Sequence, residues 1–183
     1  MQFNGPQIHL MVNHFPIVGF ILLTPILALV AWRGDAKLRQ LTLVATVVVS
    51  LFVLPAFWTG EPAEEGVEHL PGVSEKDIHE HEEAAETALT LSLVTGAIAL
   101  AGLLASKKKP AYLPLAVKVS FLGAAITSAL MANVGHEGGK IRHPEITGAT
   151  PSQECAGADA KGSEKNEDPS SDESDEESDG DEE

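Results

Sequence analysis

Four long apolar runs alternate with short polar segments along the chain. They cover about residues 9–32, 40–60, 87–106 and 112–135, and the first three contain no Asp, Glu, Lys or Arg. A run of about 20 apolar residues is long enough to cross the hydrocarbon core of a bilayer as an α-helix. The pattern therefore predicts an all-α fold, a four-helix transmembrane bundle.

Residues 74–106 are expected to form a single helix that begins in water and ends in lipid. Ser74 suits the N-cap, and the acidic residues Glu75 and Asp77 follow where the helix dipole favours negative charge. Small side chains recur in steps of three and four from His81: Ala84, Ala85, Ala88, Ser92, Thr95, Gly96 and Ala99. Small residues let a neighbouring helix approach closely in a membrane. His81 is thus predicted on the packed face, whereas His79 lies among glutamates on a solvated face. The fourth run contains a second such stripe, formed by Ala124, Ser128, Ala132 and His136.

Charge divides the chain into a membrane domain and an acidic tail. The net charge is −15, but residues 161–183 hold 12 acidic residues and 2 lysines, a net of −10, so −5 remains for the rest. Residues 1–146 are predicted to be the four-helix domain and residues 147–183 a disordered acidic tail. The acidic balance disfavours nucleic acid as a partner. The single cysteine, Cys155, cannot form an internal disulfide.

Lysine and arginine predict the topology. Both short connecting loops with a basic excess, residues 33–39 and 106–110, are expected on the cytoplasmic side of the inner membrane. Both termini and the acidic loop of residues 61–77 then lie outside. All seven histidines also fall at the outer face: His9, His14, His69, His79, His81, His136 and His143.

The opening segment carries a family resemblance. Its His-Phe-Pro sequence at His14, with His9 five residues earlier, resembles the H-P-x-x-x-H-F-P opening of an uncharacterised prokaryotic integral-membrane family, the domain of unknown function 2231 type, although Leu10 replaces the family's proline. The resemblance covers residues 8–146 and implies four helices. It also implies a histidine entering the third helix, matched by His81 or His79, and a G-G-x-x-x-x-H segment, matched by Gly138, Gly139 and His143. The architecture is remotely similar to that of small b-type cytochromes.

Three interpretations of the histidines remain open. The first is a non-covalent haem b held by imidazoles from two helices. Its candidate ligands are His14, His81, His136, His143 and His9. The second is a metal site of imidazoles and carboxylates at the outer face. Its candidate ligands are His69, His79, Glu65, Glu68 and Glu82. The third is a structural or assembly role without a cofactor. No catalytic motif indicates an enzyme.

For the haem interpretation, His14 and His81 are the predicted ligand pair. The first and third helices of an up-down-up-down bundle lie on one diagonal, so their inward side chains meet. His14 and His9 are five residues apart, about 140° around a helix, so they cannot face the same point. No histidine lies in the inner half of any span, so no second haem could carry electrons across the membrane. The expected partner is therefore quinol or a periplasmic electron carrier at the outer face.

Overall fold

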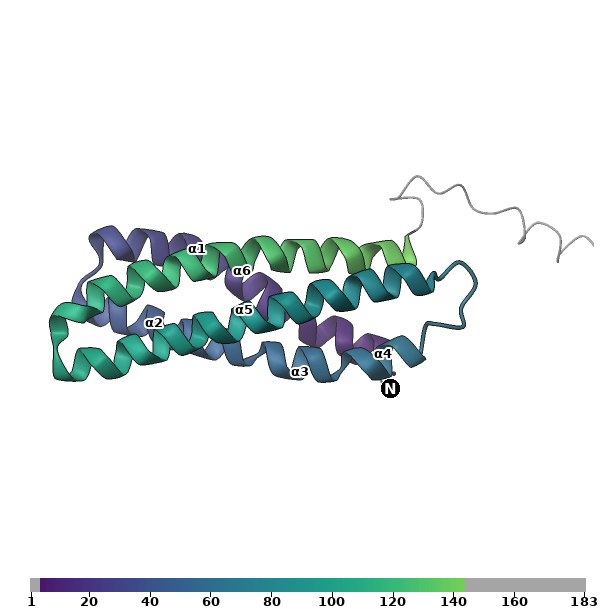
Figure 1. Cartoon of the computed structure of the whole chain (residues 1–183), viewed down its shortest axis with the longest axis horizontal. Coiled ribbons are helices and arrows are strands. Elements are labelled where there is room, and N and C mark those ends of the chain that lie inside the picture. The colour runs from purple at the N-terminus through teal and green to yellow at the C-terminus, as the bar shows by residue number, and fades with distance from the viewer. Residues whose placement is uncertain (1–3, 144–183) are drawn as a thin grey trace, which may run out of the picture. The chain divides into compact units, whose positions relative to one another are not determined.

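The computed structural model of this chain describes residues 4–143. All regular elements of these residues are helices, and none is a strand (Figure 1). The elements are α1 (Gly5–Arg33), α2 (Ala36–Leu51), α3 (Val53–Trp58), α4 (Gly60–Glu65), α5 (Glu75–Lys108), a 3-10 turn η1 (Pro110–Tyr112) and α6 (Leu113–Arg142). Since α2 and α3 together make one span, four helices are long and apolar enough to cross a membrane. The predicted all-α bundle is confirmed. The predicted tail, residues 147–183, lies outside the described residues.

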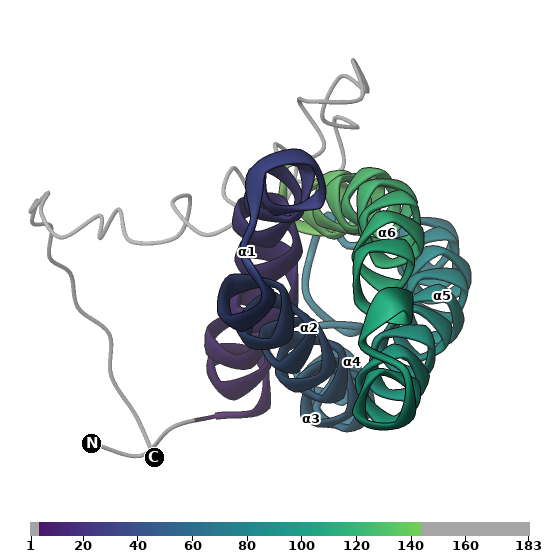
Figure 2. The ribbon, with the colours of Figure 1, turned by 90° about the vertical axis from the view of Figure 1, so that its left-hand side faces the viewer.

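The four spans form a bundle in which α1 and α5 occupy opposite corners. α1 packs against α2 and α6, and α5 packs against the same two helices, most extensively against α6 (Figure 2). The α1–α2 and α5–α6 connections lie at one end of the bundle, and α4 lies at the other (Figure 1). The up-down-up-down order expected from the sequence is therefore present, with the first and third spans on a diagonal.

Two helices are longer than the apolar runs predict. α1 begins at Gly5 because Asn4 caps it: the Asn4 side chain accepts the Gln7 N–H at 3.0 Å, and Pro6 suits the first helical turn. α6 continues past residue 135 to Arg142, since no proline interrupts it and Lys140 bonds Glu137 at 2.6 Å across one turn. Both extensions lengthen the bundle at the end that holds the histidines.

The second span is broken near the end of the bundle that holds the histidines. Pro55 has no N–H to donate, and its ring crowds the carbonyl of Leu51, four residues earlier. The helix therefore stops at Leu51 and resumes as α3 at Val53. α4 follows directly and extends into the segment predicted as an acidic loop, residues 61–77. It packs against the start of α1.

The small-residue face of α5 is packed, as predicted. Ala88 is 1% exposed and Ala99 is fully buried, as are Ser92 and Thr95. Gly96 allows α2 to approach so closely that an added Cβ would lie 2.6 Å from the Cβ of Ser50. The predicted stripe on α6 is only partly right. Ala124 is buried and Ser128 is partly buried, but Ala132 and His136 are exposed because α6 has turned that face away from the bundle there.

Buried hydroxyl groups line the helix contacts, and the sequence analysis missed them. Thr42, Thr46 and Ser50 follow one another at a spacing of four along α2, which is the sequence signal for one helical face. Hydroxyl groups also form hydrogen bonds between helices. Oγ1 of Thr95 lies 3.3 Å from Oγ1 of Thr127, and Oγ1 of Thr24 lies 2.8 Å from Oγ of Ser128. Such bonds hold helices together where no water is present.

Candidate functional site

The two histidines at the start of α5 face different surroundings, as their neighbours predict. The His81 ring is half-buried against α6, and its Nδ1 lies 3.1 Å from the backbone carbonyl oxygen of Val134. The His79 side chain is 70% exposed and pairs with carboxylates of its own helix, Glu83 at 3.4 Å and Glu82 at 3.9 Å. The predicted inward orientation of His81 is confirmed.

His9 of α1 is the histidine that meets His81. The ring centroids lie 6.4 Å apart, and the ring planes are nearly perpendicular, at 89°. Edge-to-face contacts of aromatic rings fall in this distance range. Because α1 and α5 occupy opposite corners, the pair spans the bundle from one diagonal helix to the other. Its position at the end of the bundle beside α4 agrees with the predicted gathering of imidazoles there.

The predicted pairing of His14 with His81 is corrected by this arrangement. His14 is exposed, and its Nδ1 contacts the Leu10 carbonyl and the Asn13 side chain of its own helix. His9 and His14 are separated by about 140° around α1, so a rotation of α1 that turns His9 inward turns His14 outward.

Residues from two further segments fix the positions of the paired rings. Nδ1 of His9 lies 3.1 Å from Oγ1 of Thr59, the residue between α3 and α4. Gly138 of α6 leaves room for His81: a Cβ there would lie 3.1 Å from Cε1 and 3.2 Å from Nδ1 of the ring. Thr59 was not predicted, and no sequence pattern marks it. Gly138 was noted only through the family resemblance.

Two other predicted haem ligands lie at exposed positions of the structure. His136 is exposed on α6, and His143 is exposed where that helix ends. Among the five predicted haem ligands, His9 and His81 are brought into ring contact by the bundle.

The predicted metal ligands do not assemble into a site. Within residues 4–143, no three His, Cys, Asp or Glu side chains are arranged to hold a metal ion. The predicted ligands were His69, His79, Glu65, Glu68 and Glu82. His69 pairs only with its neighbour Glu68, at 3.3 Å, with 90% of its side chain exposed. Glu65 ends α4, Glu68 and His69 follow it on the connection to α5, and His79 and Glu82 lie on the exposed face of α5.

Glu64 of α4 faces Glu82 of α5 across this end of the bundle. Burial raises the pKa of Glu64 above its ordinary value of 4.5, and a hydrogen bond to Glu82 and the negative charges of Glu82, Glu68 and Glu61 raise it further. A protonated carboxyl can donate to a neighbouring carboxylate, whereas two charged carboxylates repel each other. The contact between α4 and α5 is therefore tied to the protonation of Glu64.

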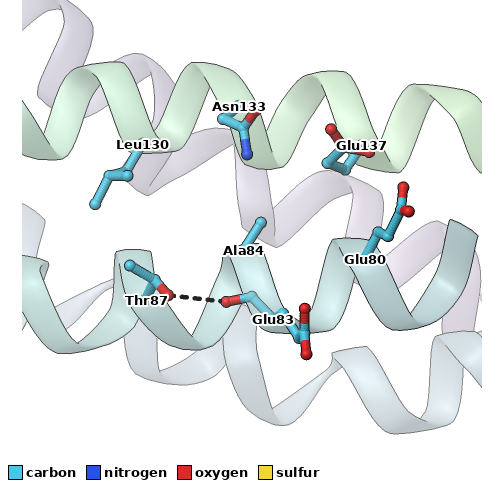
Figure 3. A pocket seen from close by; sticks show the side chains of 7 residues that line it. All are labelled: Glu80, Glu83, Ala84, Thr87, Leu130, Asn133 and Glu137. Atoms are coloured by element: carbon cyan, nitrogen blue, oxygen red, sulfur yellow. Dashed lines mark hydrogen bonds between the residues drawn. The ribbon is translucent and has the colours of Figure 1, made fainter.

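A groove of about 370 Å³ lies between α5 and α6 (Figure 3). Three carboxylates line it, Glu80, Glu83 and Glu137, and its remaining lining comes from Ala84, Thr87, Leu130 and Asn133. Figure 3 shows Glu80 and Glu137 close together from the two helices, with Leu130 and Thr87 toward the other end of the groove. Lys140 bridges the two helices by lying 2.6 Å from Glu137 and 3.9 Å from Glu80. Glu80 and Glu137 adjoin His81 and Gly138 in sequence, so the groove borders the histidine site.

Fold and site together define a multi-pass membrane protein, a four-helix bundle with two imidazoles paired across its diagonal at one end. Comparisons of the chain with protein-family models, with curated proteins and with solved structures gave no match. The resemblance of the opening segment to the uncharacterised membrane family thus stays a prediction.

Proposed function

We propose that this protein is a membrane-embedded electron carrier that binds haem b between His9 and His81. The supporting observation is the pairing of these two imidazoles from α1 and α5. Haem iron in b-type cytochromes is held by histidines from separate helices. His9 replaces His14 as the predicted partner of His81.

Two imidazoles that share one iron have ring centroids about 6.2 Å apart, and rings in direct edge-to-face contact lie at a similar separation. The centroids of His9 and His81 lie 6.4 Å apart. The spacing is therefore compatible with one iron but does not by itself distinguish iron binding from ring packing. Each Nδ1 already has an oxygen neighbour, Thr59 or Val134, so Nε2 is the ring atom that would bind iron.

Quinol is the electron-transfer partner that the surroundings favour. A haem at this position would take up and release one electron at a time. The groove between α5 and α6 borders the site and combines an apolar side, at Leu130, with carboxylates. A quinol that gives up electrons also releases protons, and carboxylates such as Glu83 can accept them. The Glu83→Gln variant should slow reduction of the haem by an added soluble quinol.

Visible spectroscopy of the purified protein tests the haem proposal. Cells supplied with haem precursor should yield protein with a Soret band, and reduction should resolve separate α and β bands. His9→Ala and His81→Ala should each abolish the six-coordinate spectrum, whereas the matched controls His14→Ala and His79→Ala should keep it. The proposal fails if purified wild-type protein has no Soret band and does not gain one on titration with haemin.

A cofactor-free structural role is the second candidate. It is favoured by the close packing of the His81 ring on Gly138 and by its bond to Val134, which join α5 to α6. In that case His81→Ala should lower thermal stability in a protein that never shows a chromophore. The same spectra distinguish the two candidates.

A further inference from the structure

The contacts of Thr59 bear on which nitrogen of His9 carries the hydrogen. Its Oγ1 lies 3.0 Å from the carbonyl oxygen of Pro55 and 2.9 Å from that of Ala56. A hydroxyl has one hydrogen to donate and carbonyl oxygens only accept. Both carbonyl oxygens lie closer to Oγ1 than Nδ1 of His9 does, at 3.1 Å, so we assign the hydroxyl hydrogen to its own helix and leave Oγ1 to accept. Nδ1–H of His9 is then the donor, and the Ala56 carbonyl is a backbone hydrogen-bond partner of the same ring.

The same reasoning applies to His81. Its Nδ1 lies 3.1 Å from the Val134 carbonyl oxygen, which cannot donate. Nδ1 of His81 must carry a hydrogen for this bond to exist. In a neutral imidazole the other nitrogen then has a lone pair and no hydrogen. Both rings of the pair consequently present an unprotonated Nε2.

We propose that Thr59 is a positioning residue of the histidine site, which holds His9 in the Nδ1–H form while the Val134 carbonyl holds His81 in the same form. Metal-bound histidines commonly donate their second ring N–H to an oxygen, which fixes both the tautomer and the ring orientation. The purpose assigned to Thr59 rests on the proposed haem function. The two tautomers are argued from the hydrogen-bond contacts alone and do not depend on that function. A site with two Nε2 lone pairs takes an electron-pair acceptor such as iron, and it does not take an anion.

Nitrogen NMR of protein labelled at its histidines tests the inference without any cofactor. In detergent at about pH 8.5, two units above the ordinary histidine pKa, His9 and His81 of the wild-type protein should be in the Nδ1–H form. His14 should be in the same form, because its Nδ1 contacts the Leu10 carbonyl oxygen. His9→Ala, His81→Ala and His14→Ala assign the three signals. Thr59→Val, which keeps the side-chain shape but removes the acceptor, should shift His9 toward the Nε2–H form. Thr59→Ser should restore the wild-type signal.

Thr87→Val is the matched control, because the Thr87 hydroxyl bonds only the Glu83 carbonyl of its own exposed turn. It should leave the His9 and His81 signals unchanged. The inference is overturned if His9 of the wild-type protein is in the Nε2–H form, or if Thr59→Val leaves its tautomer unchanged in folded protein. In haem-loaded protein Thr59→Val should also shift the midpoint potential, and Thr59→Ser should not. Failure to load haem counts against the proposed function alone, because the NMR result is obtained without it.

Discussion

Gly138 is the residue on which the position of the His81 ring most directly depends. A Cβ at Gly138 would lie 3.1 Å from the ring, while one at Gly139 would meet nothing within 4 Å. Gly139→Ala should therefore stabilise α6 by roughly 0.5–1 kcal/mol, the ordinary gain over glycine inside a helix. Gly138→Ala should stabilise the protein less than Gly139→Ala or should destabilise it, because the His81 ring must move by a few tenths of an ångström. Thermal unfolding of both variants in detergent measures the difference, and equal stabilisation would contradict the packing described.

Glu64 gives the α4 contact a defined pH dependence. Its pKa is raised in the folded protein, so its contribution to stability is fully present below about pH 4.5, its ordinary pKa. That contribution is lost as the pH rises through the folded-state pKa, since the charged carboxylate then faces Glu82. Glu64→Gln should remove this part of the pH dependence, whereas Glu65→Gln, at an exposed neighbouring position, should keep it. Hydrogen exchange of α4 amides between pH 4 and 7, compared at matched intrinsic rates, is the measurement. Identical profiles for wild type and Glu64→Gln would refute the role of Glu64.

The two paired histidines differ in how far the sequence predicts them. His81 heads a stripe of small residues, so its inward orientation follows from helical spacing alone. α1 has apolar residues on all sides, and neither His9 nor His14 is followed by a distinct packed face. Spacing shows that only one of them can face inward. The rotation of α1 that selects His9 is set by packing against other helices, which local sequence does not encode.

Among the elements, α5 depends most on close packing. Ala88 is 1% exposed within the bundle, while Ala97 is on the exposed side of the same helix. Ala88→Leu should destabilise the protein by about 1–3 kcal/mol, the usual cost of overfilling a packed core. Ala97→Leu adds the same atoms where they have room. The two variants should be compared by reversible unfolding in mixed micelles, and a stable Ala88→Leu protein would show that this face is looser than described.

The elements that hydropathy leaves unpredicted are those at the histidine end. Apolar runs predict the four spans but not the break before Val53, which follows from the position of Pro55 within the second run. They also leave α4 unpredicted, because its acidic sequence is typical of a loop. Its docking depends on backbone fit to α1: Gly66 lies where a side chain would strike the ring of Pro6. This fit between distant segments places Thr59 beside His9.

At the scale of the whole molecule, the two ends of the bundle have different chemistry. The end formed by the α1–α2 and α5–α6 connections carries Arg33 and the lysines around residue 108 (Figure 1). The opposite end carries the His9–His81 pair and the acidic groove. Since no histidine lies in the inner half of any span, a single haem at the pair could not continue an electron path across a hydrocarbon core of roughly 30 Å. The proposed carrier would therefore exchange electrons at one membrane face.

This polarity predicts how the protein is oriented in the membrane. Loops rich in Lys and Arg stay on the cytoplasmic side, so the histidine end should face outward. In a background in which Cys155→Ser removes the single native thiol, Leu70→Cys should react with a membrane-impermeant maleimide in intact cells. Lys108→Cys should react only after the cells are permeabilised, which also serves as the control that its thiol is reactive. Labelling of Lys108→Cys in intact cells would reverse the orientation and place the His9–His81 pair on the cytoplasmic side. Its electron-transfer partner would then have to be sought there, while the bundle and its histidine geometry would be unchanged.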